Sequence, residues 1–102
     1  MKTMSTQNVT KERTNTEIKE PKRYNVIMHN DDFTSMDFVV KILTDIFHKD
    51  KITARKLMMD VHLKGRGVVG SYSFDIATTK VRTAMSWAKA EGFPFRMTVE
   101  EV

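Results

Sequence analysis

The sequence contains no cysteine, and this absence excludes several kinds of site. Disulfide bonds, thiolate nucleophiles and sulfur ligands for a metal all require a cysteine side chain. Long apolar runs are missing too, because no stretch approaches the roughly 20 residues that a helix needs to cross a bilayer. The first residues also lack the apolar segment of a secretory signal. We therefore expect a protein that stays in the cytoplasm and makes no use of a membrane.

Proline, glycine and tryptophan are scarce, with two, four and one residues in a chain of 102. A chain of this length has room for one domain with one modest core. The glycines fall at positions 65, 67, 70 and 92, where we expect turns or helix ends. The net charge of +4 is mildly basic, so nucleic acid has to be considered as a partner.

The composition changes near Pro21. Residues 1–22 are rich in Lys, Glu, Thr and Asn and carry few sizeable apolar side chains. Such a segment cannot bury enough apolar surface to offset the entropy lost on ordering. We therefore expect a disordered N-terminal extension over 1–22, either a passive leader or a working tether, and a folded domain over 23–102.

The folded part begins with a pattern typical of a strand. Residues 24–29 alternate polar and apolar side chains of β-favouring types. Asn30-Asp31-Asp32 then ends the strand, because Asn and Asp side chains compete for backbone hydrogen bonds. Thr34, with Asp37 three residues on, resembles a capping box and predicts the start of a helix. The buried stripe of that helix is expected at Phe38, Val39, Ile42, Leu43, Ile46 and Phe47.

The remaining chain predicts two more helices and two more strands. A second helix opens at Ile52 and Thr53, and the glycines after it lead into a strand over 68–74. A third helix begins near Asp75 and stops at Gly92, followed by a strand over 95–99. The residues of that helix expected to face inward are Ile76, Val81, Ala84, Met85 and Ala88. The order βααβαβ predicts an α+β fold, a three-stranded, mainly antiparallel sheet packed with three helices.

Polar side chains gather at one point of this pattern. Asn30, Asp31 and Asp32 follow the first strand, and His62 lies on the second helix, which must cover the sheet near the end of that strand. Carboxylate and amide oxygens and a neutral imidazole nitrogen all accept hydrogen bonds from an ammonium group. Side chains that could form an adjoining apolar pocket are Thr34, Met36, Val39, Met58 and Val61, whereas Met59 is expected to point to the core or sheet. Methionine adapts to apolar groups of varied shape, so the pattern predicts a ligand with a positive end and an apolar body.

Each of these features also has a simpler interpretation. Asn30-Asp31-Asp32 is equally an ordinary turn between a strand and a helix. His62 is equally a histidine satisfied in the core or exposed at the surface. The cationic side chains of Lys49, Lys51, Arg55, Lys56, Lys64 and Arg66 form either a solvated helix face or a surface for phosphates. The competing hypothesis is therefore a small nucleic-acid or ribosome-associated protein.

Bond-making chemistry finds little support in the sequence. There is no HExxH motif, no pair of histidines at i and i+4, and no calcium-loop spacing of oxygen ligands. There is also no G-x-S-x-G motif to present a serine nucleophile. We expect no metal, no cofactor and no enzymatic activity.

Several of these segments together resemble the ClpS family, the N-degron adaptors of the bacterial Clp protease. The stretch YNVIMHNDDFTSMDFV (24–39) is similar to the opening of that family. The likeness continues through LMMDVH (57–62), the glycines at 65 and 70, DIATTK (75–80) and GFPF (92–95). It covers the chain from about Tyr24 to its end, and the combination is far more specific than any one piece.

The resemblance implies both a function and a site. ClpS proteins bind substrates whose first residue is Leu, Phe, Tyr or Trp, and deliver them to the AAA+ unfoldase ClpA of the ClpAP protease. Carried over to this sequence, Asn30, Asp32 and His62 would hold the α-amino group, with Asp31 alongside. The first side chain would lie among Thr34, Met36, Val39, Met58, Val61 and Phe95, and Met36 would exclude β-branched residues.

The same resemblance implies the partners. Asp75 and Lys80 would contact the N-terminal domain of ClpA, or of a ClpC-type unfoldase. Residues 1–22 would match the extension that the family uses for substrate hand-over. We expect a monomer without a nucleic-acid partner. Three residues depart from the family pattern. Ser35 replaces a common Pro, Thr78 replaces a usual Glu and Phe95 replaces a usual Leu.

Overall fold

The computed structural model describes residues 21–102, so the expected extension over 1–22 lies outside the described residues except for its last two positions. In the described part the order of elements confirms the βααβαβ prediction. The elements are β1 (Tyr24–His29), α2 (Met36–Asp45), α3 (Lys51–Lys64), β2 (Arg66–Tyr72), α4 (Phe74–Ala90) and β3 (Arg96–Glu101). Lys22, which we expected in the extension, already pairs with Glu101 of β3 at 3.2 Å.

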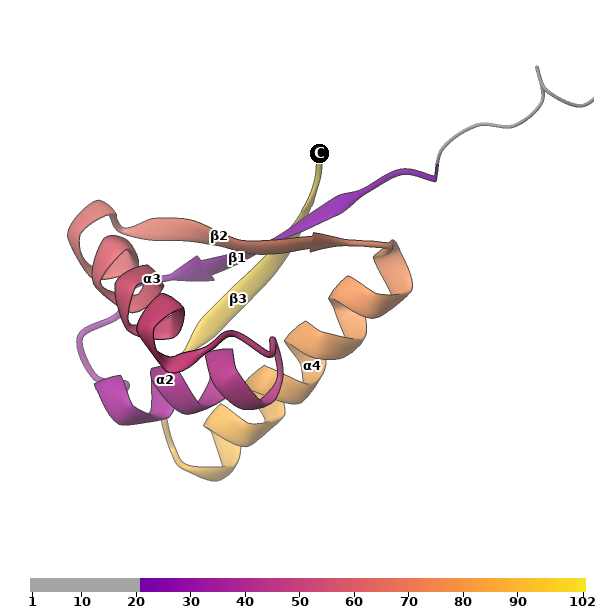
Figure 1. Cartoon of the computed structure of the whole chain (residues 1–102). Helices are drawn as coiled ribbons and strands as arrows, with labels where there is room; N and C mark the ends of the chain where they lie inside the picture. Colours follow the sequence, from indigo (N-terminus) through magenta and orange to yellow (C-terminus); the bar gives the residue numbers. More distant parts are fainter. Residues whose placement is uncertain (1–20) are drawn as a thin grey trace, which may run out of the picture.

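The sheet has β1 in its middle, with β2 and β3 antiparallel to it on either side. The three helices lie against one face of this sheet (Figure 1). Val26 and Met28 of β1 belong to the core that these helices cover, because side chains of a strand alternate between the two faces. The end of β1 and the polar residues after it therefore lie beside the helices.

Helix α2 buries Phe38, Ile42 and Leu43, as the stripe predicted. Ile46 and Phe47 are buried too, although the helix ends at Asp45 before them. Helix α4 buries Ala84 and Ala88, as expected, and also Ala77, while Val81 is partly buried against the core.

The expected inward position of Ile76 is wrong, since this side chain is 49% exposed. Met85 is 37% exposed, although its Sδ accepts a hydrogen bond from the backbone nitrogen of Met97 in β3 at 3.4 Å. Ala77, which was not expected there, joins Ala84 and Ala88 on the inward stripe, and each neighbouring position is turned about 100° around the helix axis. Small alanines on this stripe let α4 pack close to the large side chains of the sheet.

Several predicted boundaries also move. The N-cap of α2 is Ser35, whose Oγ accepts a hydrogen bond from the backbone nitrogen of Phe38 at 3.2 Å, rather than Thr34. Gly65 ends α3 in the left-handed conformation at φ +93°, so β2 begins at once, two residues before its predicted start at 68. Gly92 adopts the left-handed conformation after α4, as expected. Strand β3 starts one residue later than predicted and ends two residues later.

Candidate functional site

A cavity of about 140 Å³ opens where the end of β1 meets α2 and α3. The structure brings together in its wall every residue that we expected to contact the ligand's amino group or its apolar body. These residues are Asn30, Asp31, Asp32, Thr34, Met36, Val39, Met58, Val61, His62 and Phe95. Sequence reasoning missed three further lining residues, which are Met28, His29 and Met59.

The polar side of the pocket depends on a link between two chain segments. The backbone nitrogen of Asn30 donates a hydrogen bond to the carbonyl oxygen of Gly65 at 2.9 Å. Gly65 follows α3 directly, and its own nitrogen donates to the carbonyl of Val61 at 2.8 Å. Since His62 belongs to the last turn of α3, this link brings the imidazole to the loop that begins at Asn30.

Asp31 organises that loop. Its Oδ1 accepts hydrogen bonds from the backbone nitrogens of Phe33 and Thr34, both at 2.8 Å, and its Oδ2 accepts from the Thr34 hydroxyl, also at 2.8 Å. Partial burial by itself would raise the pKa of Asp31, but these hydrogen bonds outweigh it and hold the pKa below its ordinary value. Both carboxylate oxygens of Asp31 are therefore engaged in shaping the turn before α2.

Asn30, Asp32 and His62 differ from Asp31, because all three are exposed at the pocket. Within residues 21–102, no hydrogen bond or ion pair of the structure engages their side chains. An amide oxygen, a carboxylate and an imidazole thus remain available as acceptors for a ligand.

The apolar side of the pocket has a buried floor and an open mouth. Met28, Val61 and Phe95 are nearly fully buried, whereas Met36 at the start of α2 is 58% exposed. Met59 was expected to point to the core or sheet, which is wrong, because it lines the pocket and is 40% exposed. The buried residues of α3 are Ala54 and Val61, and Met59 is turned away from their stripe.

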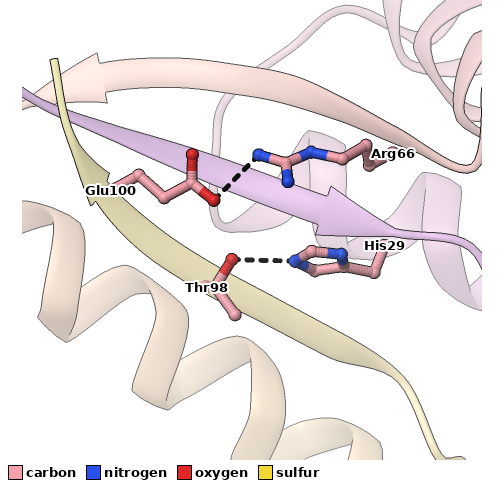
Figure 2. A network of polar contacts seen from close by, with 4 residues as sticks. All are labelled: His29, Arg66, Thr98 and Glu100. Atoms are coloured by element: carbon pink, nitrogen blue, oxygen red, sulfur yellow. Dashed lines mark hydrogen bonds and ion pairs between the residues drawn. The ribbon is translucent and has the colours of Figure 1, made fainter.

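His29 lies at the edge of the pocket, and its ring joins a second polar network (Figure 2). Its Nε2 is hydrogen-bonded to Thr98 Oγ1 at 2.8 Å, and Arg66 Nη2 pairs with Glu100 Oε2 at 2.8 Å. Burial, and then the nearby cations of Arg96 and Arg66, lower the pKa of His29 against the opposing carboxylate of Glu100. A neutral His29 bonded to Thr98 therefore links β1 to β3 within the sheet.

The two residues expected to contact an unfoldase lie outside the pocket. Asp75 is exposed in the first turn of α4. Lys80 donates a hydrogen bond from Nζ to the carbonyl oxygen of Ile46 at 2.7 Å and lies 5.6 Å from the ring centroid of Phe47 and 5.7 Å from that of Tyr72. Lys80 thus joins α4 to the end of α2.

Two further properties of the described part bear on function. Among residues 21–102, no three His, Asp or Glu side chains come together in a way that could hold a metal ion. In the same part of the chain, no helix is both long and apolar enough to cross a membrane.

The fold and the pocket together define a small α+β binding domain, whose site combines hydrogen-bond acceptors with an apolar wall. The family model described as "ATP-dependent Clp protease adaptor protein ClpS" matches residues 19–98. The chain therefore belongs to the ClpS family, which confirms the family and the fold expected from the sequence.

Curated relatives agree with this assignment. The ATP-dependent Clp protease adapter protein ClpS of Oleidesulfovibrio alaskensis is 54% identical over 86 residues, which cover 84% of this chain and 83% of the relative. That of Acetivibrio thermocellus is 46% identical over 97 residues, covering 95% and 98%. A similar solved structure is Agrobacterium tumefaciens ClpS2 bound to L-phenylalaninamide. It has a TM-score of 0.79 and 38% identity, and the match covers 81% of this chain and 100% of that one.

Proposed function

We propose that this chain is a protease adaptor that binds proteins by a free N-terminal amino group and a bulky apolar first side chain. The preferred first residues are Leu, Phe, Tyr and Trp. The bound protein is delivered to the Clp protease through its unfoldase, ClpA or a ClpC-type relative. The chain acts as a monomer in the cytoplasm and is not itself an enzyme.

The proposal rests on one observation, that a single pocket combines free hydrogen-bond acceptors with an apolar wall. Asn30, Asp32 and His62 provide free acceptors at one side, and a methionine-rich wall provides apolar contact at the other. An α-amino group has a pKa of about 7.7–8.0 and is mostly cationic at neutral pH. The first residue of a protein is the position where such a cation and an apolar side chain share one Cα atom.

The energies of these contacts suit an adaptor. Each hydrogen bond to a charged group contributes about 1.5–3 kcal/mol, and full burial of a Phe side chain contributes about 2–3 kcal/mol. Two or three such bonds together with the side chain give roughly 5–12 kcal/mol before the costs of association. Micromolar binding corresponds to about −8 kcal/mol, which the upper part of this range can supply when those costs are modest, and cargo can still be released at that affinity.

The relative bound to L-phenylalaninamide supports the same assignment. That small molecule has a free α-amino group, a phenyl side chain and an amide in place of the next peptide bond. It therefore imitates an N-terminal phenylalanine. With 38% identity between the two chains, we carry this ligand class over to the pocket described above.

Within the pocket we assign Asn30, Asp32 and His62 to the amino group. Asp31, whose oxygens are already engaged, holds the loop in shape. Met36 at the exposed mouth excludes first residues that branch at Cβ. The first side chain lies against the deeper wall that Val61 and Phe95 form.

Delivery requires a second surface, which we assign to the start of α4. Asp75 lies there between the exposed side chains of Phe74 and Ile76. Lys80 supports this surface by joining α4 to the end of α2. Residues 1–22 take part in the hand-over of the bound protein.

Fluorescence anisotropy of labelled peptides tests the proposal. A peptide that begins with Leu should bind, whereas its N-acetylated, Met-first and Gly-first counterparts should bind far more weakly. Asp32→Ala and His62→Ala should abolish the difference between free and acetylated peptides. Equal binding of all four peptides, or binding of none, would contradict the proposal.

A further inference from the structure

Gly67 lies on β2 directly opposite Met28, where α3 packs against the sheet. A Cβ atom at this position would stand 2.9 Å from Cγ2 of Val61 and 3.8 Å from Cδ1 of Leu57. A separation of 2.9 Å is well below the roughly 3.5–4.0 Å at which two carbon atoms attract each other. The absence of a side chain at Gly67 therefore allows Val61 to lie directly against β2.

Val61 is also a wall of the ligand pocket, and it is 3% exposed. Gly67 does not line that pocket, whereas Val61 both lines it and is the side chain that a Cβ at position 67 would meet first. The side chain of valine in a helix adopts one rotamer in about 90% of cases. A methyl group on Gly67 would thus displace the Val61 side chain, and α3 with it, instead of finding free space.

We propose that Gly67 is a positioning residue that sets the size of the pocket for the first side chain of a bound protein. This inference rests on the proposed function and deepens it. With glycine at position 67, Val61 is held back against β2 and the cavity admits the largest aromatic side chains. With alanine there, Val61 moves, and the room for Trp and Phe shrinks before that for Leu does.

The test compares peptides that begin with Trp, Phe and Leu on the full chain and on Gly67→Ala. We expect Gly67→Ala to weaken binding of the Trp peptide about tenfold relative to the Leu peptide, since inserting a methyl group into a packed core costs enough for such a change. The readout is the ratio of the two affinities, which a uniform loss of stability would leave unchanged.

Gly70→Ala provides a matched control. Gly70 belongs to the same strand, and a Cβ atom there would stand 2.6 Å from the hydroxyl oxygen of Tyr72. Tyr72 packs against Phe47 and does not line the ligand pocket. Gly70→Ala should lower the thermal midpoint of unfolding but leave the ratio between the Trp and Leu peptides as in the wild type.

Two variants at Val61 complete the test, and they keep it decisive if Gly67→Ala folds poorly. Val61→Ala removes the atom that a Cβ at position 67 would meet, so it should shift the ratio toward Trp. The double variant Gly67→Ala with Val61→Ala should restore a ratio close to that of the wild type. An unchanged ratio in folded Gly67→Ala or, where that variant does not fold, in Val61→Ala would overturn the role of Gly67, while leaving the proposed function intact. Failure of the wild type to bind any of the peptides would overturn both.

Discussion

Arg66 and Glu100 form an ion pair that spans the middle strand of the sheet, with Nη2 and Oε2 2.8 Å apart (Figure 2). Arg66 belongs to β2 and Glu100 to β3, and β1 runs between them. On this face of β1, Ile27 lies midway between the partners of these two residues, His29 and Asn25. Although the helices cover the opposite face, Ile27 is 2% exposed. The side chains of the polar network therefore shield an apolar residue from water.

We expect the ion pair itself to contribute little to stability. Both side chains are about half exposed, and pairs of this kind contribute about 0–1 kcal/mol. A double-mutant cycle with Arg66→Ala and Glu100→Gln, measured by urea unfolding, should give a coupling below about 1 kcal/mol that falls with added salt. Glu101→Gln, which removes the more exposed pair with Lys22, is the control. A coupling that is large and insensitive to salt would contradict this view.

Asp31 should make the domain sensitive to acid. Because its pKa in the folded state is lowered, the carboxylate contributes stability that is fully present above the unfolded pKa of about 3.9. That contribution is lost as the pH falls through the lowered pKa. Asp31→Ala should cost about 0.5–2 kcal/mol at pH 7, as loss of a cap does. The difference in unfolding free energy between wild type and variant should shrink toward pH 2, and a constant difference would refute the assignment.

Met36→Ala should relax selectivity at the pocket. Met36 is exposed at the mouth, where a first residue branched at Cβ would meet its side chain. The variant should bind peptides beginning with Ile or Val more tightly than the wild type does, and keep its affinity for Leu within a few-fold. Unchanged discrimination between Leu and Ile in anisotropy titrations would exclude Met36 as the gate. Because the side chain is exposed, little loss of stability is expected.

Replacement of Lys80 should lower the stability of the domain, whatever its effect on delivery. Lys80→Met removes the hydrogen bond to the carbonyl of Ile46 and the ammonium group that lies over the rings of Phe47 and Tyr72. Hydrogen bonds to charged groups contribute about 1.5–3 kcal/mol, so we expect a loss of about 1–3 kcal/mol in unfolding free energy. Wild-type stability of this variant would show that the bond is unimportant.

Asp75→Ala should weaken binding to the unfoldase without changing the stability of the domain. Asp75 is exposed and makes no side-chain bond within the part of the chain that the structure describes. Its substitution should leave the unfolding free energy within about 0.5 kcal/mol of the wild type. Binding to the isolated N-terminal domain of ClpA should nevertheless weaken, as measured by calorimetry. If binding to that domain is unchanged, the surface at the start of α4 is not the contact.

Much of the site could be predicted from local sequence patterns. The alternation over 24–29 places the break at Asn30-Asp31-Asp32 at the end of a strand, and helical spacing puts Met58 and His62 on one side of the second helix. These relationships depend only on the two periods of regular structure, so they hold before any packing is known. Local patterns therefore predict that the acceptors and most of the apolar wall share one pocket, and the structure does bring them together. For Phe95, only the resemblance to the ClpS family implies a place in that pocket.

Other features depend on distances that no local pattern contains. Lys80 reaches the carbonyl of Ile46 across 34 positions of sequence, and Gly67 matters because Val61 lies against it. The rotation of α4 about its own axis decided that Ala77 faces the core and Ile76 does not. Composition and periodicity determined which elements form and which residues can share a site. Only tertiary packing decided how closely those elements approach, because it must satisfy the volumes and hydrogen bonds of all of them at once.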